Sequence, residues 1–197
     1  MLLDRKTFLI KEQIQFMKLS GTYNIFDPES QQQIGVAKEE PSGFIKFLRL
    51  FISKLMLPTK VAVYDQGEPN PIFTMEKPFS WFRSKVGIYD RNGSYLGYFR
   101  SKLLTLGGGF FVFDANECQI AEIKGDWKGW NFKFLNNDGK EMGVVTKKWA
   151  GLGKELFTSA DNYIISISDT IEQGPELSTL LLAAGLAIDI VFKEDKR

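Results

Sequence analysis

The most regular feature of the sequence is an alternation of apolar and polar residues that stops at a short polar turn and then resumes. It occurs five times, in YNIFDPESQQQIGVAKE, VAVYDQGEPNPIFTME, VGIYDRNGSYLGYFRSK, FFVFDANECQIAEIKG and FKFLNNDGKEMGVVTKK. A period of two marks a strand with one buried face, and Asp, Asn and Gly suit tight turns. Each segment is therefore predicted to be a β-hairpin.

An acidic residue marks the turn of each hairpin. These residues are Asp27, Asp65, Asp90, Asp114 and Asp138. The last four recur at intervals of 24 or 25 residues, which indicates repeated supersecondary units. We interpret the five as turn and capping residues and not as a catalytic set, because repeated hairpins place them at separate tips.

Two further apolar segments extend the pattern. FLIKEQ near the start and NYIISISD near the end raise the expected number of strands to roughly twelve. So many antiparallel strands must close on themselves or divide into two sheets to protect their edges. No linker or change of composition interrupts the chain, and residues 1–197 are predicted to form a single domain.

Residues 41–58, PSGFIKFLRLFISKLMLP, have apolar residues at the spacing of an amphipathic helix. Its charged residues are all basic: Lys46, Arg49 and Lys54. Such a helix can lie on an anionic membrane surface. The alternative is a helix that packs on the outer wall of the β-structure with its basic side chains in solvent.

A second helix is predicted at Pro175–Phe192, PELSTLLLAAGLAIDIVF, where Pro and Glu favour a helix start. Its apolar residues surround the helix, so it must be buried in lipid or in protein. It is shorter than the roughly 20 apolar residues that a bilayer requires, and it contains Asp189. We predict that it fills the inside of the β-structure, with a C-terminal membrane anchor as the alternative.

The composition removes several classes of enzyme. The chain of 197 residues has no His and one Cys, Cys118, which excludes Ser-His-Asp and Cys-His nucleophiles, His-ligated metals and internal disulfides. No spacing of the remaining acidic, Lys, Ser or Tyr residues indicates a paired catalytic set. The sequence favours a non-enzymatic protein, and the single Cys favours a cytoplasmic location.

Two stretches combine aromatic and basic residues. Residues 77–102 include Trp81, Arg83 and Lys85 within a strongly basic segment, which suits an anionic membrane surface or an ordinary solvated strand. KGDWKGWNFKF, at 124–134, mixes Lys and Trp as single-stranded nucleic-acid sites do. At a net charge of +1 we expect no nucleic-acid partner.

The segment GVVTKKWAGLGKELFTSADNYIISI, at 143–167, with the later AIDIVF, resembles the C-terminal part of the phospholipid scramblases. The matching features are the basic pair Lys147 and Lys148 before Trp149, Gly151, the run Glu155–Thr158, Ala160-Asp161-Asn162, and Tyr163. FLIKEQIQF, YNIFD and VAVYD…FTMEKPF follow the order of the same family, so the resemblance covers about residues 7–192.

The resemblance implies a mainly β fold: a closed twelve-stranded antiparallel barrel around a central hydrophobic C-terminal helix, as in scramblases, plant LURP-one-related proteins and the tubby C-terminal domain. It also implies contact with phospholipid. We expect lipid contact at Lys46, Arg49, Lys54, Trp81, Arg83, Lys85, Lys147, Lys148 and Trp149.

Calcium is the one cofactor that the resemblance suggests, because scramblases carry an acidic calcium segment. Here Ser159 replaces its first acid, Asp161 matches, and Asp169 falls one position early with Thr170 in the aligned slot. Calcium prefers six to eight oxygen ligands. Asp161, Asn162 and Asp169 are the expected ligands, and the alternative is that Asp161 and Asn162 form the turn before a strand.

Two functions follow from these observations. The first is a non-enzymatic protein that binds anionic phospholipids at a membrane surface, peripheral to the membrane, with lipid scrambling as a further activity. The second is a scaffold that binds a protein or a small ligand and has no role with lipids.

Overall fold

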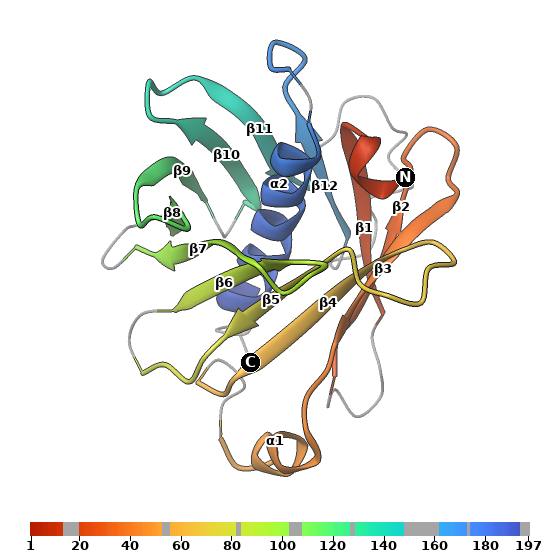
Figure 1. Ribbon diagram of the computed structural model, residues 1–197, viewed down its shortest axis with the longest axis vertical. Coiled ribbons are helices and arrows are strands. Elements are labelled where there is room, and N and C mark those ends of the chain that lie inside the picture. Colours follow the sequence, from red (N-terminus) through yellow and green to blue (C-terminus); the bar gives the residue numbers. More distant parts are fainter. Residues whose placement is uncertain are drawn as a thin grey trace.

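A computed structural model describes residues 1–13, 20–52, 56–81, 84–102, 108–126, 129–147, 162–172 and 174–193. Twelve antiparallel strands form a closed barrel in which each strand pairs with its neighbours in sequence and β1 pairs with β12 (Figure 1). The strands are β1 (Thr7–Gln13), β2 (Thr22–Phe26), β3 (Gln33–Glu39), β4 (Thr59–Asp65), β5 (Phe73–Lys77), β6 (Lys85–Asp90), β7 (Tyr95–Ser101), β8 (Gly109–Asp114), β9 (Gln119–Asp126), β10 (Asn131–Asn136), β11 (Glu141–Thr146) and β12 (Asn162–Ile167). The barrel fold and the five hairpins are confirmed.

Three of the hairpin turns share one hydrogen-bonding scheme. The Oδ1 atoms of Asp90, Asp114 and Asn136 each accept from the backbone N–H groups two and four residues later, at 2.7–3.0 Å. The acceptor in the last turn is therefore Asn136, and Asp138 lies within the turn. An acceptor side chain at the first position satisfies the turn backbone, which explains the regular spacing of these residues.

Asp27 stabilises the β2–β3 turn in a related way. Its Oδ1 accepts from the N–H groups of Glu29 and Ser30, and Arg5 lies 3.0 Å from its Oδ2. The hydrogen bond from the Ser30 backbone lowers the pKa of the Asp27 carboxyl, and Glu29 and Arg5 add to this effect against the opposing effect of partial burial.

Replacing Asp27 by Asn is expected to lower the stability of the protein at neutral pH, because these interactions favour the charged carboxylate. The folded-state pKa lies below the unfolded one, so the contribution is present above the unfolded pKa and is lost as pH falls through the folded value. Urea unfolding of both proteins at pH 7 and pH 3 measures this. A difference that persists undiminished at pH 3 would contradict the explanation.

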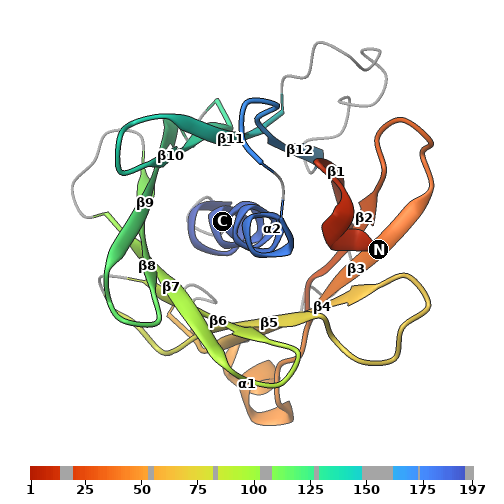
Figure 2. The ribbon, with the colours of Figure 1, turned by 45° about the horizontal axis from the view of Figure 1, so that its top comes forward.

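The C-terminal helix α2 (Pro175–Ile188) lies inside the ring of strands, and a short π-helix (Asp189–Lys193) continues it (Figure 2). Every residue from Leu181 to Ile188 is buried. A Cβ atom at Gly185 would lie 2.4 Å from Ile165 Cδ1, and one at Gly143 would lie 2.9 Å from Leu181 Cδ2. Small residues therefore allow the helix and the wall to approach closely, and the prediction of a helix inside the barrel is confirmed.

The far end of this helix brings a carboxyl group into the core. Asp189 is 3% exposed. Burial raises the pKa of Tyr23 and of Tyr163 well above the usual value, and the Asp189 charge raises both further. The two phenols therefore stay protonated, the form that a barrel core tolerates.

The connections of the barrel divide between two ends. The hairpin turns that follow β2, β4, β6, β8 and β10 emerge at one end, which we call the turn end. The connections that follow β1, β3, β5, β7, β9 and β11 emerge at the opposite end, the loop end. Because α2 follows β12, it enters at the turn end and runs toward the loop end.

Candidate functional site

The loop end carries the short helix α1 (Gly43–Leu48), which lies outside the ring of strands (Figure 2). Ser42 begins it by accepting a hydrogen bond from Ile45 N–H at 3.3 Å. After Leu48 two backbone hydrogen bonds span three residues instead of four: Leu50 N–H donates to Phe47 O, and Phe51 N–H donates to Leu48 O. The predicted helix is therefore present in this segment but is shorter than 41–58: it is six residues long, and residues 49–52 continue as turns.

The apolar side of this segment faces solvent. Phe44, Phe47 and Phe51 are 69%, 57% and 74% exposed. The expected packing of an apolar helix face against the barrel wall is therefore wrong for these residues. Lys46 is also exposed, so the segment presents aromatic and basic side chains together.

A buried ion pair explains this orientation. Arg49 Nη1 lies 2.9 Å from Glu39 Oε2, and the two side chains are 3% and 0% exposed. Glu39 Oε2 also accepts from Gly21 N–H at 3.0 Å. Because Arg49 points into the barrel end, the aromatic residues on the other sides of the segment point outward. Arg49 therefore anchors the α1 segment to the barrel. The expectation that Arg49 contacts lipid is wrong, because its side chain is buried.

A second exposed aromatic group follows β5. Phe79 and Trp81 pack edge to face with ring centroids 5.6 Å apart. Ser80 N–H donates to Met56 O at 3.2 Å, which joins this connection to the end of the α1 connection. We define the aromatic patch as the exposed apolar side chains of these two connections: Phe44, Phe47, Leu50, Phe51, Phe79 and Trp81.

Basic residues differ in how available they are. Lys85 is exposed at the start of β6, with its Nζ 3.8 Å from the centroid of the Tyr98 ring. Lys147 Nζ lies 4.5 Å from the centroid of the Trp130 ring, also at the loop end. Lys77 is buried and donates to Leu57 O at 2.7 Å. Lys54, Arg83, Lys148 and Trp149 lie outside the described residues.

The expected calcium ligands are not brought together. Asn162 begins β12 at the loop end, whereas Asp169 follows the strand at the turn end, where its carboxylate lies 3.3 Å from Lys6 Nζ. An extended strand separates them by about 20 Å, too far for both to bind one ion. Asp161 lies outside the described residues. Within the described part of the chain, no group of three acidic, His or Cys side chains could hold a metal.

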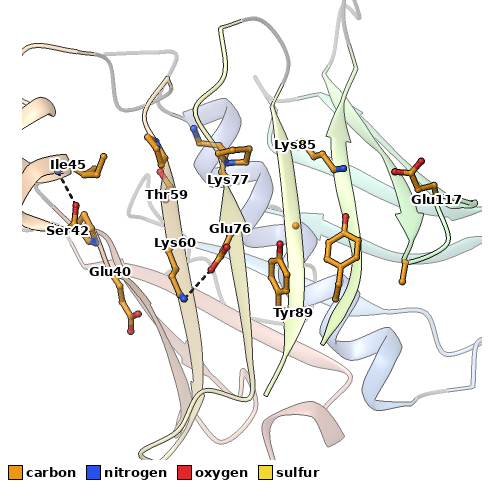
Figure 3. A pocket seen from close by; sticks show the side chains of 16 residues that line it. Glu40, Ser42, Ile45, Thr59, Lys60, Glu76, Lys77, Lys85, Tyr89 and Glu117 are labelled. Carbon is orange, nitrogen blue, oxygen red and sulfur yellow. Dashed lines mark hydrogen bonds and ion pairs between the residues drawn. The ribbon is translucent and has the colours of Figure 1, made fainter. Parts of the chain in front are cut away.

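A groove of about 810 Å³ runs along the outer wall across β4 to β7, beside the start of α1 (Figure 3). Lys60 and Glu76 form an ion pair of 3.1 Å on its floor. Glu76 pairs with Gly87 across β5 and β6. Since Gly87 has no side chain, the Tyr89 ring lies against its backbone, and the adjacent Tyr95 ring has its centroid 5.3 Å from that of Tyr89.

Sequence reasoning missed this groove. Its residues come from strands β4 to β7, from the connections that follow β3 and β5, and from the β8–β9 turn, so the sequence alone does not show that they meet. One local signal was present: Glu117 occupies the turn position that Gly93 and Gly139 hold in two other hairpins.

No helix in the described part of the chain has both the length and the apolar character needed to cross a bilayer. The fold and its surface define a class of protein: a closed β-barrel that is filled by its own helix and exposes aromatic and basic residues at one end. The family model named Scramblase matches residues 1–195, and the chain belongs to this family. The resemblance inferred from the sequence is confirmed.

Two curated proteins are similar to this chain. One is the Saccharomyces cerevisiae protein "Altered inheritance rate of mitochondria protein 25", 25% identical over 83% of this chain and 59% of its own length. The other is a phospholipid scramblase family protein of Schizosaccharomyces pombe, 23% identical over 98% of this chain and 55% of its own length. The chain thus spans little more than half the length of these relatives. No solved structure matches it significantly.

Proposed function

We propose that this protein binds phospholipid at a membrane surface, without catalysis, through the aromatic patch and the basic residues beside it. The observation that carries the proposal is the exposure of six large apolar side chains on two neighbouring connections, from 45% for Phe79 to 74% for Phe51. Within each connection the rings are in contact, Phe47 with Phe51 and Phe79 with Trp81, and clustered exposed apolar side chains usually mark an interaction site. Phe and Trp side chains suit the interface between headgroups and acyl chains.

Charge favours a membrane with anionic lipid as the occupant of this patch. Lys46 lies within the patch segment, and Lys85 follows it in β6. Each basic residue close to an anionic leaflet contributes about 1 kcal/mol of attraction. The Scramblase membership of the chain supports lipid as the ligand. The protein would then be peripheral, with its loop end toward the lipid.

Binding and scrambling are separate activities. Helix α2 occupies the centre of the barrel with eight successive buried residues, Leu181–Ile188. A lipid path through the centre would require this helix to leave, so surface binding is the function that we propose here. Any calcium-dependent step would need ligands beyond the pair Asn162 and Asp169.

Replacing Phe47 and Phe51 together by Ser is expected to weaken binding to anionic vesicles at least tenfold. Full burial of one Phe is worth about 1.5–3 kcal/mol, and each 1.4 kcal/mol corresponds to about a factor of ten in affinity. Co-sedimentation with vesicles of phosphatidylcholine and phosphatidylserine, with calcium and with a chelator, measures it.

The matched control is Leu96→Ser, which removes an apolar side chain that is 38% exposed on β7, away from the patch. It should bind as the original protein does. Absence of binding to any anionic vesicle would refute the proposed function. If the double variant binds as tightly as the original protein, the aromatic patch is not the membrane-binding surface.

A further inference from the structure

Glu117 has a backbone conformation that costs free energy for a residue with a side chain. Its φ is +63°, and Gly93 and Gly139 have φ of +81° and +78° at the same position of their turns. In all three turns the N–H of this residue donates to the backbone O of the first turn residue, at 3.0–3.2 Å. This three-residue turn favours Gly at its last position. A Glu in this unfavourable conformation indicates a functional role for its side chain.

The Glu117 side chain lines the groove on the outer wall, together with Lys85, Tyr89 and Tyr95. Figure 3 shows the Glu117 carboxylate and the Lys85 ammonium on the same side of Tyr89. Within the described residues, neither Lys85 nor Glu117 forms an ion pair. Lys85 therefore presents a cation in the groove, with its ammonium over the Tyr98 ring, and Glu117 presents a carboxylate. The other charged side chains that line the groove have described partners: Lys60 pairs with Glu76, Lys77 donates to Leu57 O, and Glu40 accepts from the Tyr64 hydroxyl.

Two tyrosines that line the groove add hydroxyl groups. A Cβ atom at Gly87 would lie 3.3 Å from Tyr89 Cε2, 3.4 Å from the Tyr89 hydroxyl oxygen and 3.5 Å from Tyr95 Cε2, so the outer ends of both rings lie against Gly87 in the groove wall. Partial burial raises the pKa of Tyr95, and Tyr89, Tyr98 and Glu117 raise it further. Tyr95 thus remains protonated and can donate a hydrogen bond. No described residue hydrogen-bonds either hydroxyl.

From this arrangement we infer that the groove binds a phosphate bearing a primary ammonium group, as in a phosphoethanolamine headgroup. Lys85 and the hydroxyls of Tyr89 and Tyr95 hold the phosphate oxygens, and Glu117 accepts from the ammonium. Charge-assisted hydrogen bonds of both signs fit this zwitterion. A quaternary ammonium has no N–H to donate to Glu117, and a headgroup with an added carboxylate would be repelled by it.

The source of this ligand is either a membrane lipid or a free phosphoamine. The lipid source rests on the proposed function, because the groove begins beside α1. A barrel seated on a membrane by the aromatic patch would hold the Lys85 end of the groove nearest the headgroups, with Tyr89, Tyr95 and Glu117 farther along the wall. The ligand chemistry itself does not depend on membrane binding, so the two can fail separately.

The first experiment titrates the full chain with glycerophosphoethanolamine, the water-soluble diester headgroup, and follows the groove residues by NMR. A ligand of this size is expected to bind with a Kd of about 1 mM. Glycerophosphocholine should bind about tenfold more weakly, because it lacks the ammonium N–H groups. Absence of glycerophosphoethanolamine binding, or equal binding of the choline diester, would overturn the inference.

Glu117→Gly is the decisive variant because its two effects have opposite signs. It should raise the urea midpoint of unfolding, by relieving the backbone conformation, while weakening glycerophosphoethanolamine about tenfold and not weakening inorganic phosphate, because a nearby negative charge is removed. Lys85→Met should weaken both ligands. Unchanged glycerophosphoethanolamine binding by Glu117→Gly would refute the assigned role.

The matched control is Gly139→Glu, which places a Glu at the equivalent position of the β10–β11 turn. It should lower the urea midpoint and leave ligand binding unchanged. A loss of binding in this control would attribute the Glu117 effect to the fold and so contradict a direct contact.

Vesicles identify the source. If phosphatidylethanolamine, added at a constant anionic fraction, strengthens binding of the original protein and not of Glu117→Gly, the ligand is the lipid headgroup. If the soluble diester binds and the lipid has no such effect, the ligand is a free phosphoamine. The Phe47→Ser and Phe51→Ser double variant should still bind the soluble diester, whether or not the proposed membrane binding is correct.

Discussion

A chain that ends at residue 172 is expected to lose the cooperative unfolding transition of the barrel. Helix α2 supplies a large share of the core, including Leu181, Leu182, Leu186 and Ile188, each 0% exposed. Full burial of one Leu or Ile contributes about 1.5–3 kcal/mol, and proteins are stable by only about 5–15 kcal/mol in total. Removing the helix therefore removes more free energy than the fold has to spare.

The shape of the barrel makes the loss larger. The inward residues of the strands, such as Phe8, Phe99 and Ile165, belong to one core cluster with the helix. Without α2 they would line a wide apolar cavity, which either fills with water or collapses. Urea unfolding followed by near-ultraviolet circular dichroism measures the effect, and a chain that ends at residue 193 is the control. A folded and cooperative 1–172 chain would show that the helix is an appendage.

Arg49→Met is expected to destabilise the protein by about 3–5 kcal/mol, the usual cost of removing one partner of a buried ion pair. The cost arises because Glu39 would remain buried at 0% exposure beside an uncharged side chain. Gly21 N–H would still donate to Glu39, but a backbone N–H carries no net charge to balance the carboxylate as the guanidinium does. The loss should also release the α1 segment from the barrel end.

Lys46→Met provides the matched control, because it makes the same replacement of a basic side chain on α1 at an exposed position. It should change the free energy of unfolding by less than about 0.5 kcal/mol, as surface substitutions usually do. Replacing both partners, with Glu39→Leu and Arg49→Met, should be milder than Arg49→Met alone. Equal effects of Arg49→Met and Lys46→Met would contradict the anchoring role of Arg49.

The fold was predictable because its signals are local and repeated. Alternating residues mark each strand, and acceptors such as Asp90, Asp114 and Asn136 mark the turns. The apolar character of Leu181–Ile188 on every side indicates a helix buried in lipid or in protein, and its short length and Asp189 favoured protein. The alternating pattern did not show whether the twelve strands close into a barrel or divide into two sheets. The closed barrel was predicted from the family resemblance.

The candidate sites were less predictable because they depend on which side of a segment faces inward. The sequence of 41–58 does not distinguish Lys46 from Arg49, since both are basic residues of one predicted helix. In the structure only Arg49 is buried, because it pairs with the carboxylate of Glu39, ten residues before it. The expected calcium ligands Asn162 and Asp169 are close together in the sequence. The extended strand β12 between them places them at opposite ends of the barrel.

By itself, the sequence determined the strands, the hairpin turns, the buried helix and the absence of His-based chemistry, because each depends on residues close together in the chain. Only the tertiary structure decided the outward aromatic patch and the groove around Lys85, Tyr89, Tyr95 and Glu117. The physical reason is barrel closure with a fixed register. Pairing of β5 with β6 and of β6 with β7 sets Glu76, Gly87 and Tyr98 in one row, and local sequence patterns carry no information about such neighbours.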